Sequence, residues 1–194
     1  LRGHQSLHAA EDGPKEKVTS AGFTNGLLTD LYELTMAAGF FAAGKSEDPA
    51  TFELSLRRLP PNRGYVLAAG LAQAVEYLTS VNFSAEDVRY LQSLRQFRNA
   101  PPGFFDRLRQ FRFTGDLHAV AEGTPVFPGE PLLRVRAPLV EAQIVETYLL
   151  ATIGFQSMIA TKAARVAGAA GGRGVVEFGT RRAHSPEAGV LASR

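Results

Sequence analysis

The chain has 194 residues, of which 45% are hydrophobic and 21% are charged, and it contains no cysteine. This apolar content is enough to bury a core in one or two domains and argues against disorder of the whole chain. The 21 Lys and Arg residues nearly balance the 19 Asp and Glu residues, and no basic stripe stands out, so charge does not indicate a nucleic-acid partner. Without cysteine, neither a disulfide framework nor a thiolate metal site is possible, which fits a cytoplasmic protein.

The first 20 residues are polar and are interrupted by Gly13 and Pro14. They lack the apolar stretch of a signal peptide, and we read no later segment as a membrane span. We therefore predict a flexible extension over residues 1–24 and no membrane partner.

Two local patterns predict the first helix and the first strand. Asp30 followed by Glu33 resembles a capping box, so we predict a helix over residues 31–41. Residues 51–56 alternate strictly between polar and apolar side chains, which predicts a half-buried strand. The arginines and prolines that follow this strand mark a turn.

The middle of the chain has the pattern of helices followed by short strands. Apolar stripes predict a helix over residues 66–78, a second helix with Ser84 as its N-cap, and a short third helix over residues 104–111. Between residues 113 and 135 the apolar period changes to two, and prolines and glycines interrupt it. This pattern predicts short strands joined by tight turns.

The last third of the chain has the pattern of the beginning of a β/α repeat. A long helical region opens at Pro138, a glycine-rich loop follows, and Val175–Phe178 has the pattern of a compact strand. A polar loop comes next, and Pro186 opens another helix. A closed β/α barrel needs about 250 residues, so we expect only the beginning of one here.

These elements predict an α/β fold class with three regions. After the extension over residues 1–24, we expect an α+β N-terminal domain over residues 25–137, in which helices pack on the predicted strands. Residues 138–194 are then a helical connection and the first β/α unit of an incomplete barrel domain.

The loop after Phe178 carries side chains suited to an anion. Arg181 and Arg182 stand together there, and a guanidinium group clamps carboxylate or phosphate in a bidentate way. In β/α barrels, ligands bind at the carboxyl ends of strands, where this loop is expected. The residues alone leave two interpretations open, an anion site and a solvated basic turn.

Three further residues are open to two interpretations each. Asp30 and Tyr32 either cap and pack on the first helix or belong to a site, and Arg57 is either a solvated strand end or an anion ligand. The sequence has no group of His, Asp and Glu with metal-ligand spacing, and no phosphate-loop or nucleophile-elbow motif. The residues alone therefore predict an α/β protein with an anion-binding loop.

Several segments together resemble nicotinate phosphoribosyltransferases. Residues 27–36, LLTDLYELTM, are similar to the N-terminal signature of that family, and residues 52–60, FELSLRRLP, resemble its next block. Later segments are similar to further blocks in the family's order, namely AAGL at 68–71, EPLLRV at 130–135, Glu146-Thr147, ATKAAR at 160–165 and EFGTRRAH at 177–184.

The resemblance implies a type II phosphoribosyltransferase of NAD biosynthesis. Such an enzyme joins nicotinate to phosphoribosyl pyrophosphate and forms nicotinate mononucleotide and pyrophosphate. The ring nitrogen attacks ribose C1 as pyrophosphate leaves. Mg²⁺ and cationic side chains offset the phosphate charge, and ATP hydrolysis, coupled through a phosphorylated histidine, drives the reaction forward.

The resemblance also implies how the nicotinate ring is held. Phe178 and Tyr32 would sandwich the ring between aromatic faces. In relatives the tyrosine comes from the partner subunit, so a homodimer with shared active sites is expected. Asp30 would have at most a positioning role, because its carboxylate would repel the nicotinate carboxylate.

Cationic residues would bind the anionic parts of the substrates. Arg181, with Thr180 and Arg182 beside it, would meet phosphate or carboxylate, and Arg57 would reach the pyrophosphate. The family's phosphorylated histidine would lie beyond Arg194, which leaves the catalytic residues unknown. We therefore expect the chain alone to be an inactive part of the enzyme.

Two alternatives to a nicotinate enzyme stay open. One is a relative that uses nicotinamide or quinolinate, and the other is a truncated, non-catalytic dimerisation module. The Thr180–Arg182 sequence and the closeness of the first signature favour the nicotinate enzyme.

Overall fold

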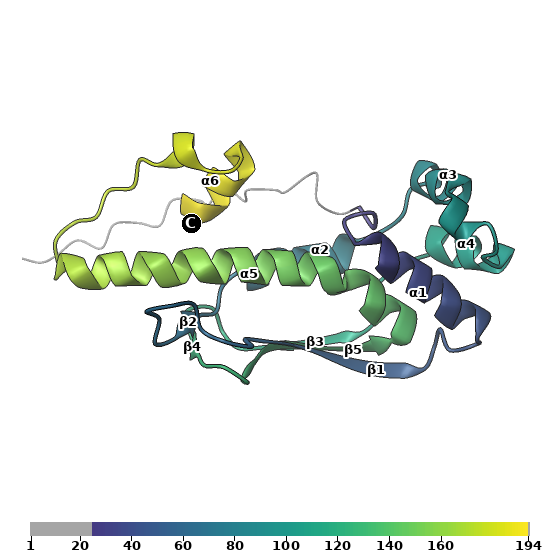
Figure 1. Cartoon of the computed structure of the whole chain (residues 1–194), viewed down its shortest axis with the longest axis horizontal. Helices are drawn as coiled ribbons and strands as arrows, with labels where there is room; N and C mark the ends of the chain where they lie inside the picture. The colour runs from purple at the N-terminus through teal and green to yellow at the C-terminus, as the bar shows by residue number, and fades with distance from the viewer. Residues whose placement is uncertain (1–24, 194) are drawn as a thin grey trace, which may run out of the picture.

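The computed structural model describes residues 25–193, in which helices and two small sheets surround one long helix (Figure 1). The extension predicted over residues 1–24 lies outside the described residues. The helices are α1 (Leu31–Ala42), α2 (Leu71–Ser80), α3 (Ala85–Ser93), α4 (Pro102–Arg109), α5 (Leu139–Ala170) and α6 (Pro186–Ser193), with short 3₁₀ helices η1 (Arg95–Phe97) and η2 (Thr180–Arg182). The strands are β1 (Pro49–Ser55), β2 (Val66–Leu67), β3 (Asp116–Ala119), β4 (Pro125–Val126) and β5 (Pro131–Pro138).

The three-stranded sheet is antiparallel and has the order β1-β5-β3. Leu133, Val135 and Ala137 of the central strand are buried, whereas the arginines between them are exposed. On the exposed face, Arg134 Nη2 lies 2.5 Å from Glu53 Oε1 directly across the β1–β5 ladder. The predicted alternation and the predicted strands between residues 113 and 135 are thus confirmed.

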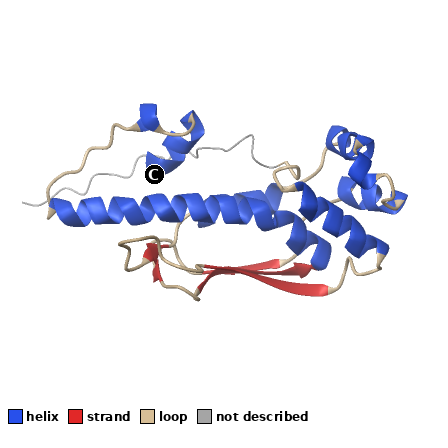
Figure 2. Ribbon diagram, in the orientation of Figure 1, coloured by secondary structure: helices blue, strands red, loops and turns tan. Residues whose placement is uncertain are grey.

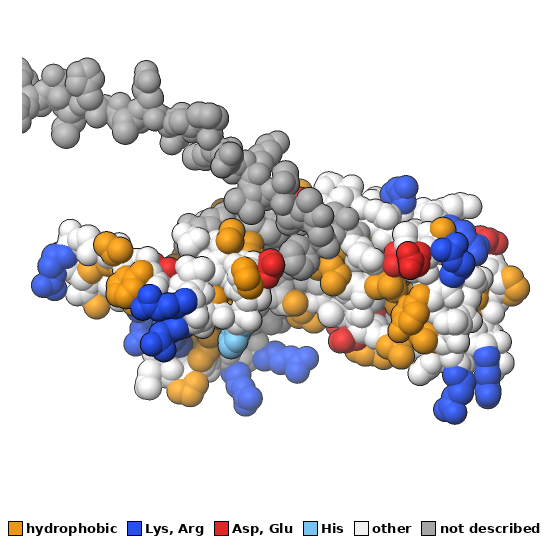
Figure 3. All heavy atoms as spheres, turned by 90° about the horizontal axis from the view of Figure 1, so that it is seen from above, with side chains coloured by type: hydrophobic (Ala, Val, Ile, Leu, Met, Phe, Trp, Pro, Cys, Tyr) orange, Lys and Arg blue, Asp and Glu red, His pale blue; other side chains and the backbone are white. Residues whose placement is uncertain are grey.

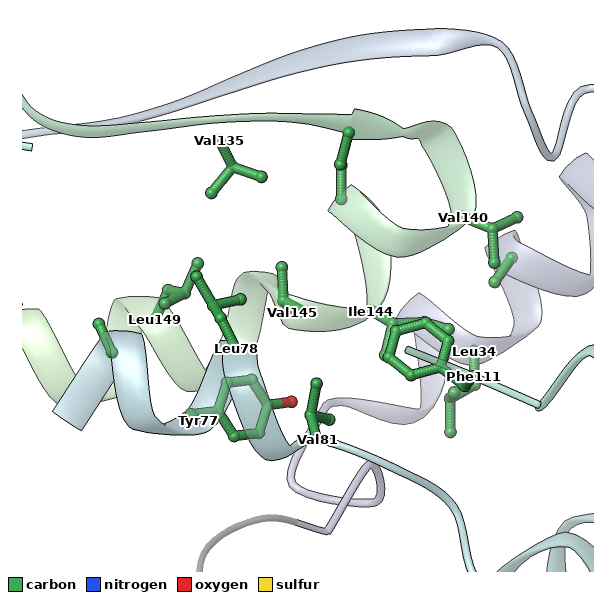
Figure 4. Packing of buried hydrophobic residues seen from close by; sticks show 14 of the residues in the cluster. Leu34, Tyr77, Leu78, Val81, Phe111, Val135, Val140, Ile144, Val145 and Leu149 are labelled. Atoms are coloured by element: carbon green, nitrogen blue, oxygen red, sulfur yellow. The ribbon is translucent and has the colours of Figure 1, made fainter. Parts of the chain in front are cut away.

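The core lies between the sheet, α5, α1 and α2. Figure 2 shows the strands on one side of the long helix, and Figure 4 shows Val135 of the sheet facing Val145 and Leu149 of α5, with Leu78 of α2 beyond them. Ile144 and Val145 have no exposed surface. A glycine inside a helix costs about 1 kcal/mol, yet α5 passes through Gly154 unbroken, because packing against several elements stabilises it.

By length and apolar composition, α5 could cross a membrane, which corrects our reading that no segment has that character. Its polar side chains show that it is a core helix in this fold. Thr161 Oγ1 accepts a hydrogen bond from the backbone N–H of Leu67 at 2.9 Å, and Ser157 Oγ accepts one from that of Ala69 at 3.0 Å.

The predicted helix over residues 66–78 is wrong at its beginning. Val66 and Leu67 form β2, which pairs with β4, and α2 begins only at Leu71. Gly70 lies between the two elements in a left-handed conformation, with φ 100°, and separates them. Pairing with β4, which is distant in sequence, overrides the local apolar stripe.

The predicted strand over Val175–Phe178 does not form either. These residues have no regular secondary structure, and Val176 and Phe178 are 81% and 73% exposed. A strand of a parallel sheet is stabilised by hydrogen-bonded neighbours and by cover on both faces. The described residues supply neither to this segment, so the first barrel unit is not built.

Candidate functional site

The residues that the sequence singles out lie in three places, and all of them are exposed. The segment between α5 and α6 carries Phe178, Thr180, Arg181 and Arg182. The beginning of α1 carries Asp30 and Tyr32, and the end of β1 is followed by Arg57. Figure 1 shows the segment of η2 and α6 across α5 from the sheet, and α1 beside the other end of α5.

The first place is a ring with a cation over it. The Arg181 Cζ atom lies 6.0 Å from the centroid of the Phe178 ring, a cation–π distance. The 3₁₀ turn that holds this arginine closes with a bond from the Arg182 N–H to the Gly179 carbonyl, at 2.7 Å. A planar ligand with an anionic group can stack on such a ring and direct its charge to the guanidinium.

This face of the molecule mixes cationic and apolar side chains. Figure 3, seen from the side of α6, shows clusters of Lys and Arg among exposed hydrophobic side chains. Phe178 contributes one of the most exposed apolar surfaces among the described residues. An exposed aromatic ring beside guanidinium groups can contact a ligand that is both aromatic and negatively charged.

The second place, the beginning of α1, differs from the predicted capping box. The Asp30 side chain makes no capping bond. Glu33 is instead fully buried, where it accepts hydrogen bonds from Gln143 Nε2 and, at 3.3 Å, from Thr147 Oγ1. Two donors on α5 satisfy the carboxyl group inside the protein, so it does not turn back to cap its own helix.

Negative charge gathers around this end of α1. Hydrogen bonding to Glu33, with the charges of Glu33, Glu146 and Asp30, raises the pKa of the Tyr32 phenol to about 12. Burial first, and then the charges of Glu33 and Asp30, raise the pKa of the Glu146 carboxyl. The negative charge at this helix end repels a ligand carboxylate from this place.

The structure brings some of the predicted residues together and leaves others apart. Phe178 and Arg181 form a cation–π pair, and Asp30 and Tyr32 share one helix end. Within one chain these two groups lie along different parts of α5 (Figure 1). Within the described residues of one chain, Phe178 and Tyr32 do not share a site, and the shared site stays a prediction.

Sequence reasoning missed the polar group under α1. The sequence pattern places Glu33 in a cap, Thr147 enters only through the family resemblance, and Gln143 carries no prediction. A signal was present, because Gln143, Glu146 and Thr147 interrupt an otherwise apolar stretch of helix. Polar residues on a buried helical face usually have partners, which pointed to a carboxyl or amide elsewhere in the chain.

A separate hollow of about 160 Å³ lies between β1, β5 and α5. Apolar side chains such as Phe52 and Leu150 line it, together with Glu146, and it contains none of the predicted site residues. Within residues 25–193, no three His, Asp or Glu side chains are grouped to hold a metal ion.

Solved structures define the class of this fold. The crystal structure of human nicotinic acid phosphoribosyltransferase superposes on this chain with a TM-score of 0.79 at 41% identity. The match covers 85% of this chain and 33% of the human chain. A nicotinate-nucleotide pyrophosphorylase from Pyrococcus furiosus shares the fold, with a TM-score of 0.63 at 22% identity. The described residues therefore have the fold of the N-terminal part of a type II phosphoribosyltransferase.

Sequence comparison defines the family. Residues 27–154 match the nicotinate phosphoribosyltransferase (NAPRTase) N-terminal domain. The chain is 49% identical to nicotinate phosphoribosyltransferase pncB2 of Mycobacterium tuberculosis over 87% of its length, and 46% identical to the Bacillus subtilis enzyme over 87%. It is 40% identical to the human enzyme over 95% of the present chain. The chain belongs to the nicotinate phosphoribosyltransferase family, and it spans about a third of the length of these relatives.

Proposed function

We propose that the protein catalyses the transfer of a phosphoribosyl group from phosphoribosyl pyrophosphate to nicotinate, a step of NAD biosynthesis in the cytoplasm. The observation that carries this proposal is the family membership, with relatives named nicotinate phosphoribosyltransferase at 40% to 49% identity over 86% to 95% of this chain. The chemistry of the loop after α5 agrees with it, because a ring that bears a carboxylate needs both stacking and a cation.

In this proposal the nicotinate ring stacks on Phe178. Arg181 binds an anionic group of the substrates, either the carboxylate or a phosphate. The position of the Arg181 guanidinium over the Phe178 ring supports that assignment. Tyr32 of a second copy closes the other face of the ring, which makes the working unit a homodimer. The exposed, neutral phenol of Tyr32 suits this role, since an ionised one would repel the ligand.

The remaining assignments concern charge and position. Thr180 and Arg182 flank the arginine and bind substrate oxygens, and Arg57 reaches the pyrophosphate. Asp30 positions the ring and keeps the carboxylate on the side of Arg181 by repulsion. Mg²⁺ would enter bound to the phosphates of the substrate, and ATP would enter as a co-substrate. No residue within 25–193 is assigned a step that involves Mg²⁺ or ATP.

The test is a synthesis assay on the purified product of the whole gene. Nicotinate, phosphoribosyl pyrophosphate, Mg²⁺ and ATP are supplied, and nicotinate mononucleotide is measured by chromatography. We expect turnover with nicotinate and little with nicotinamide or quinolinate. Turnover with one of those two instead would assign the protein to the sister reaction.

The chain of residues 1–194 is assayed beside it, and we expect no turnover from it alone. If the whole product is folded and dimeric but turns over none of the three substrates, the activity proposed here is wrong. A non-catalytic dimerisation role then becomes the better account.

A further inference from the structure

The first turn of α1 is held from below by a small set of polar groups on α5. Thr147 Oγ1 accepts a hydrogen bond from the backbone N–H of Asp30 at 3.2 Å and lies 3.5 Å from Thr29 Oγ1. The same hydroxyl donates to Glu33 Oε1 at 3.3 Å. The two residues that flank Tyr32 closely in sequence, Asp30 and Glu33, are thus tied to one hydroxyl.

The buried carboxyl group of Glu33 determines which way that hydroxyl points. A threonine hydroxyl has one proton and two lone pairs. Because Glu33 takes the proton, the lone pairs of Thr147 are left facing Asp30 and Thr29 as acceptors. The second carboxyl oxygen of Glu33 is held in turn by Gln143 Nε2, so the carboxyl group has little freedom to rotate.

This arrangement matters because the first turn of α1 has no other cap. The Asp30 side chain makes no capping bond, and an uncapped helix end frays. Leu34, Ala37 and Ala38 pack the later part of the helix into the core, but Leu31 and Tyr32 are 41% and 52% exposed. Apolar packing therefore secures the body of α1 and leaves its first turn to the polar groups.

We infer that Glu33 and Thr147 are positioning residues that hold Asp30 and Tyr32 in the geometry needed for the aromatic ring of the substrate. Neither residue touches the ligand. Their role is to restrict the first turn of α1, so that Tyr32 meets the ring without first being ordered. The inference rests on the proposed function, since it concerns the ring contacts assigned there.

The experiment compares two threonines on α5 that make the same kind of bond. In the whole gene product, Thr147→Val removes the hydroxyl that accepts from Asp30, and Thr147→Ser keeps it. Thr161→Val is the matched control, because Thr161 Oγ1 likewise accepts from a backbone N–H, that of Leu67, and donates to the Ser157 carbonyl. All three changes leave the exposed ring-binding side chains in place.

We expect Thr147→Val to raise KM for nicotinate about three- to tenfold, because ordering a first turn that has lost its bonds to Thr147 costs about as much free energy as one net hydrogen bond. KM for phosphoribosyl pyrophosphate should not change, and Thr147→Ser should restore the lower value. Thr161→Val should lower the melting temperature and leave KM for nicotinate unaltered. Equal KM values for wild type and a folded Thr147→Val enzyme would overturn the inference.

Backbone amide exchange on the chain separates this inference from the proposed function. Thr147→Val should speed the exchange of the Asp30 and Glu33 amides, which donate to Thr147 Oγ1 and to the Asp30 carbonyl, at least threefold, whereas Thr161→Val should not. If the whole product makes no nicotinate mononucleotide but the amides respond in this way, the proposed activity is wrong and the positioning holds. If Thr147→Val does not fold, Glu33→Gln replaces it, and unchanged exchange in that variant likewise refutes the inference.

Discussion

Replacing Tyr77 by phenylalanine should stabilise the protein. The Tyr77 ring is 1% exposed and stacks on Tyr148 of α5, with ring centroids 3.8 Å apart and 11° between the planes. Its hydroxyl has no hydrogen-bond partner among the described residues. A buried polar group without a partner costs about 1 to 3 kcal/mol, and phenylalanine keeps the ring and its stacking. Allowing for the small void that the lost oxygen leaves, we expect the free energy of unfolding to rise by about 1 kcal/mol.

Alkaline pH should enlarge this difference. Burial raises the pKa of the Tyr77 hydroxyl above its ordinary value of 10.0. The unfolded chain therefore releases this proton at a lower pH than the folded protein, and the stability of the wild type falls as pH rises above 10. The Tyr77→Phe variant lacks this hydroxyl, so the share of the stability loss that comes from its ionisation disappears.

Urea unfolding followed by circular dichroism, at pH 7 and at pH 10.5, measures both effects. Tyr148→Phe is the control, because that half-buried hydroxyl is hydrogen-bonded to Thr152 and its loss should lower the free energy of unfolding by about 0.5 to 1.5 kcal/mol. The reasoning is refuted if Tyr77→Phe lowers the stability as Tyr148→Phe does. The buried hydroxyl would then have a partner, such as a bound water molecule.

Three further changes test other parts of the structure. Ser84→Ala removes one half of the capping box that Ser84 forms with Asp87 and should cost about 1 kcal/mol in urea unfolding, with the exposed Ser93→Ala near zero. Glu146→Gln should stabilise the folded protein at pH 7 and lose this advantage below about pH 4.5, because burial and nearby charges raise the pKa of Glu146 in the folded state only. A gain in stability that does not vary with pH would contradict this cause. In the whole gene product, Arg181→Ala should raise KM for an anionic substrate about 10- to 100-fold in steady-state kinetics. An unchanged KM would remove this residue from the proposed site.

Short-range patterns in the sequence were sufficient for several elements. The alternation over residues 51–56 marks β1, and Ser84 caps α3 with the reciprocal bonds that its spacing to Asp87 allows. The order of the family segments between residues 27 and 184 identified the family that the comparisons show. The clustering of arginines after Phe178 likewise marked the loop where a cation lies over an aromatic ring. Apart from the order of the family segments, each of these features is decided by residues within a few positions of one another.

Other features depended on partners that no local pattern contains. The spacing of Asp30 and Glu33 suits a capping box, but Glu33 turns inward because Gln143 and Thr147, more than a hundred residues later, offer it two donors. Val66 and Leu67 leave a helical pattern because β4 offers a ladder.

The segment Val175–Phe178 has the composition of a strand and stays irregular, because a strand requires neighbours to bond its backbone and the described residues give it none. The sequence by itself determined which groups could carry chemistry and where the chain turns. The tertiary structure decided which of them are buried, paired and held still, since hydrogen bonds and burial depend on what the rest of the chain places nearby.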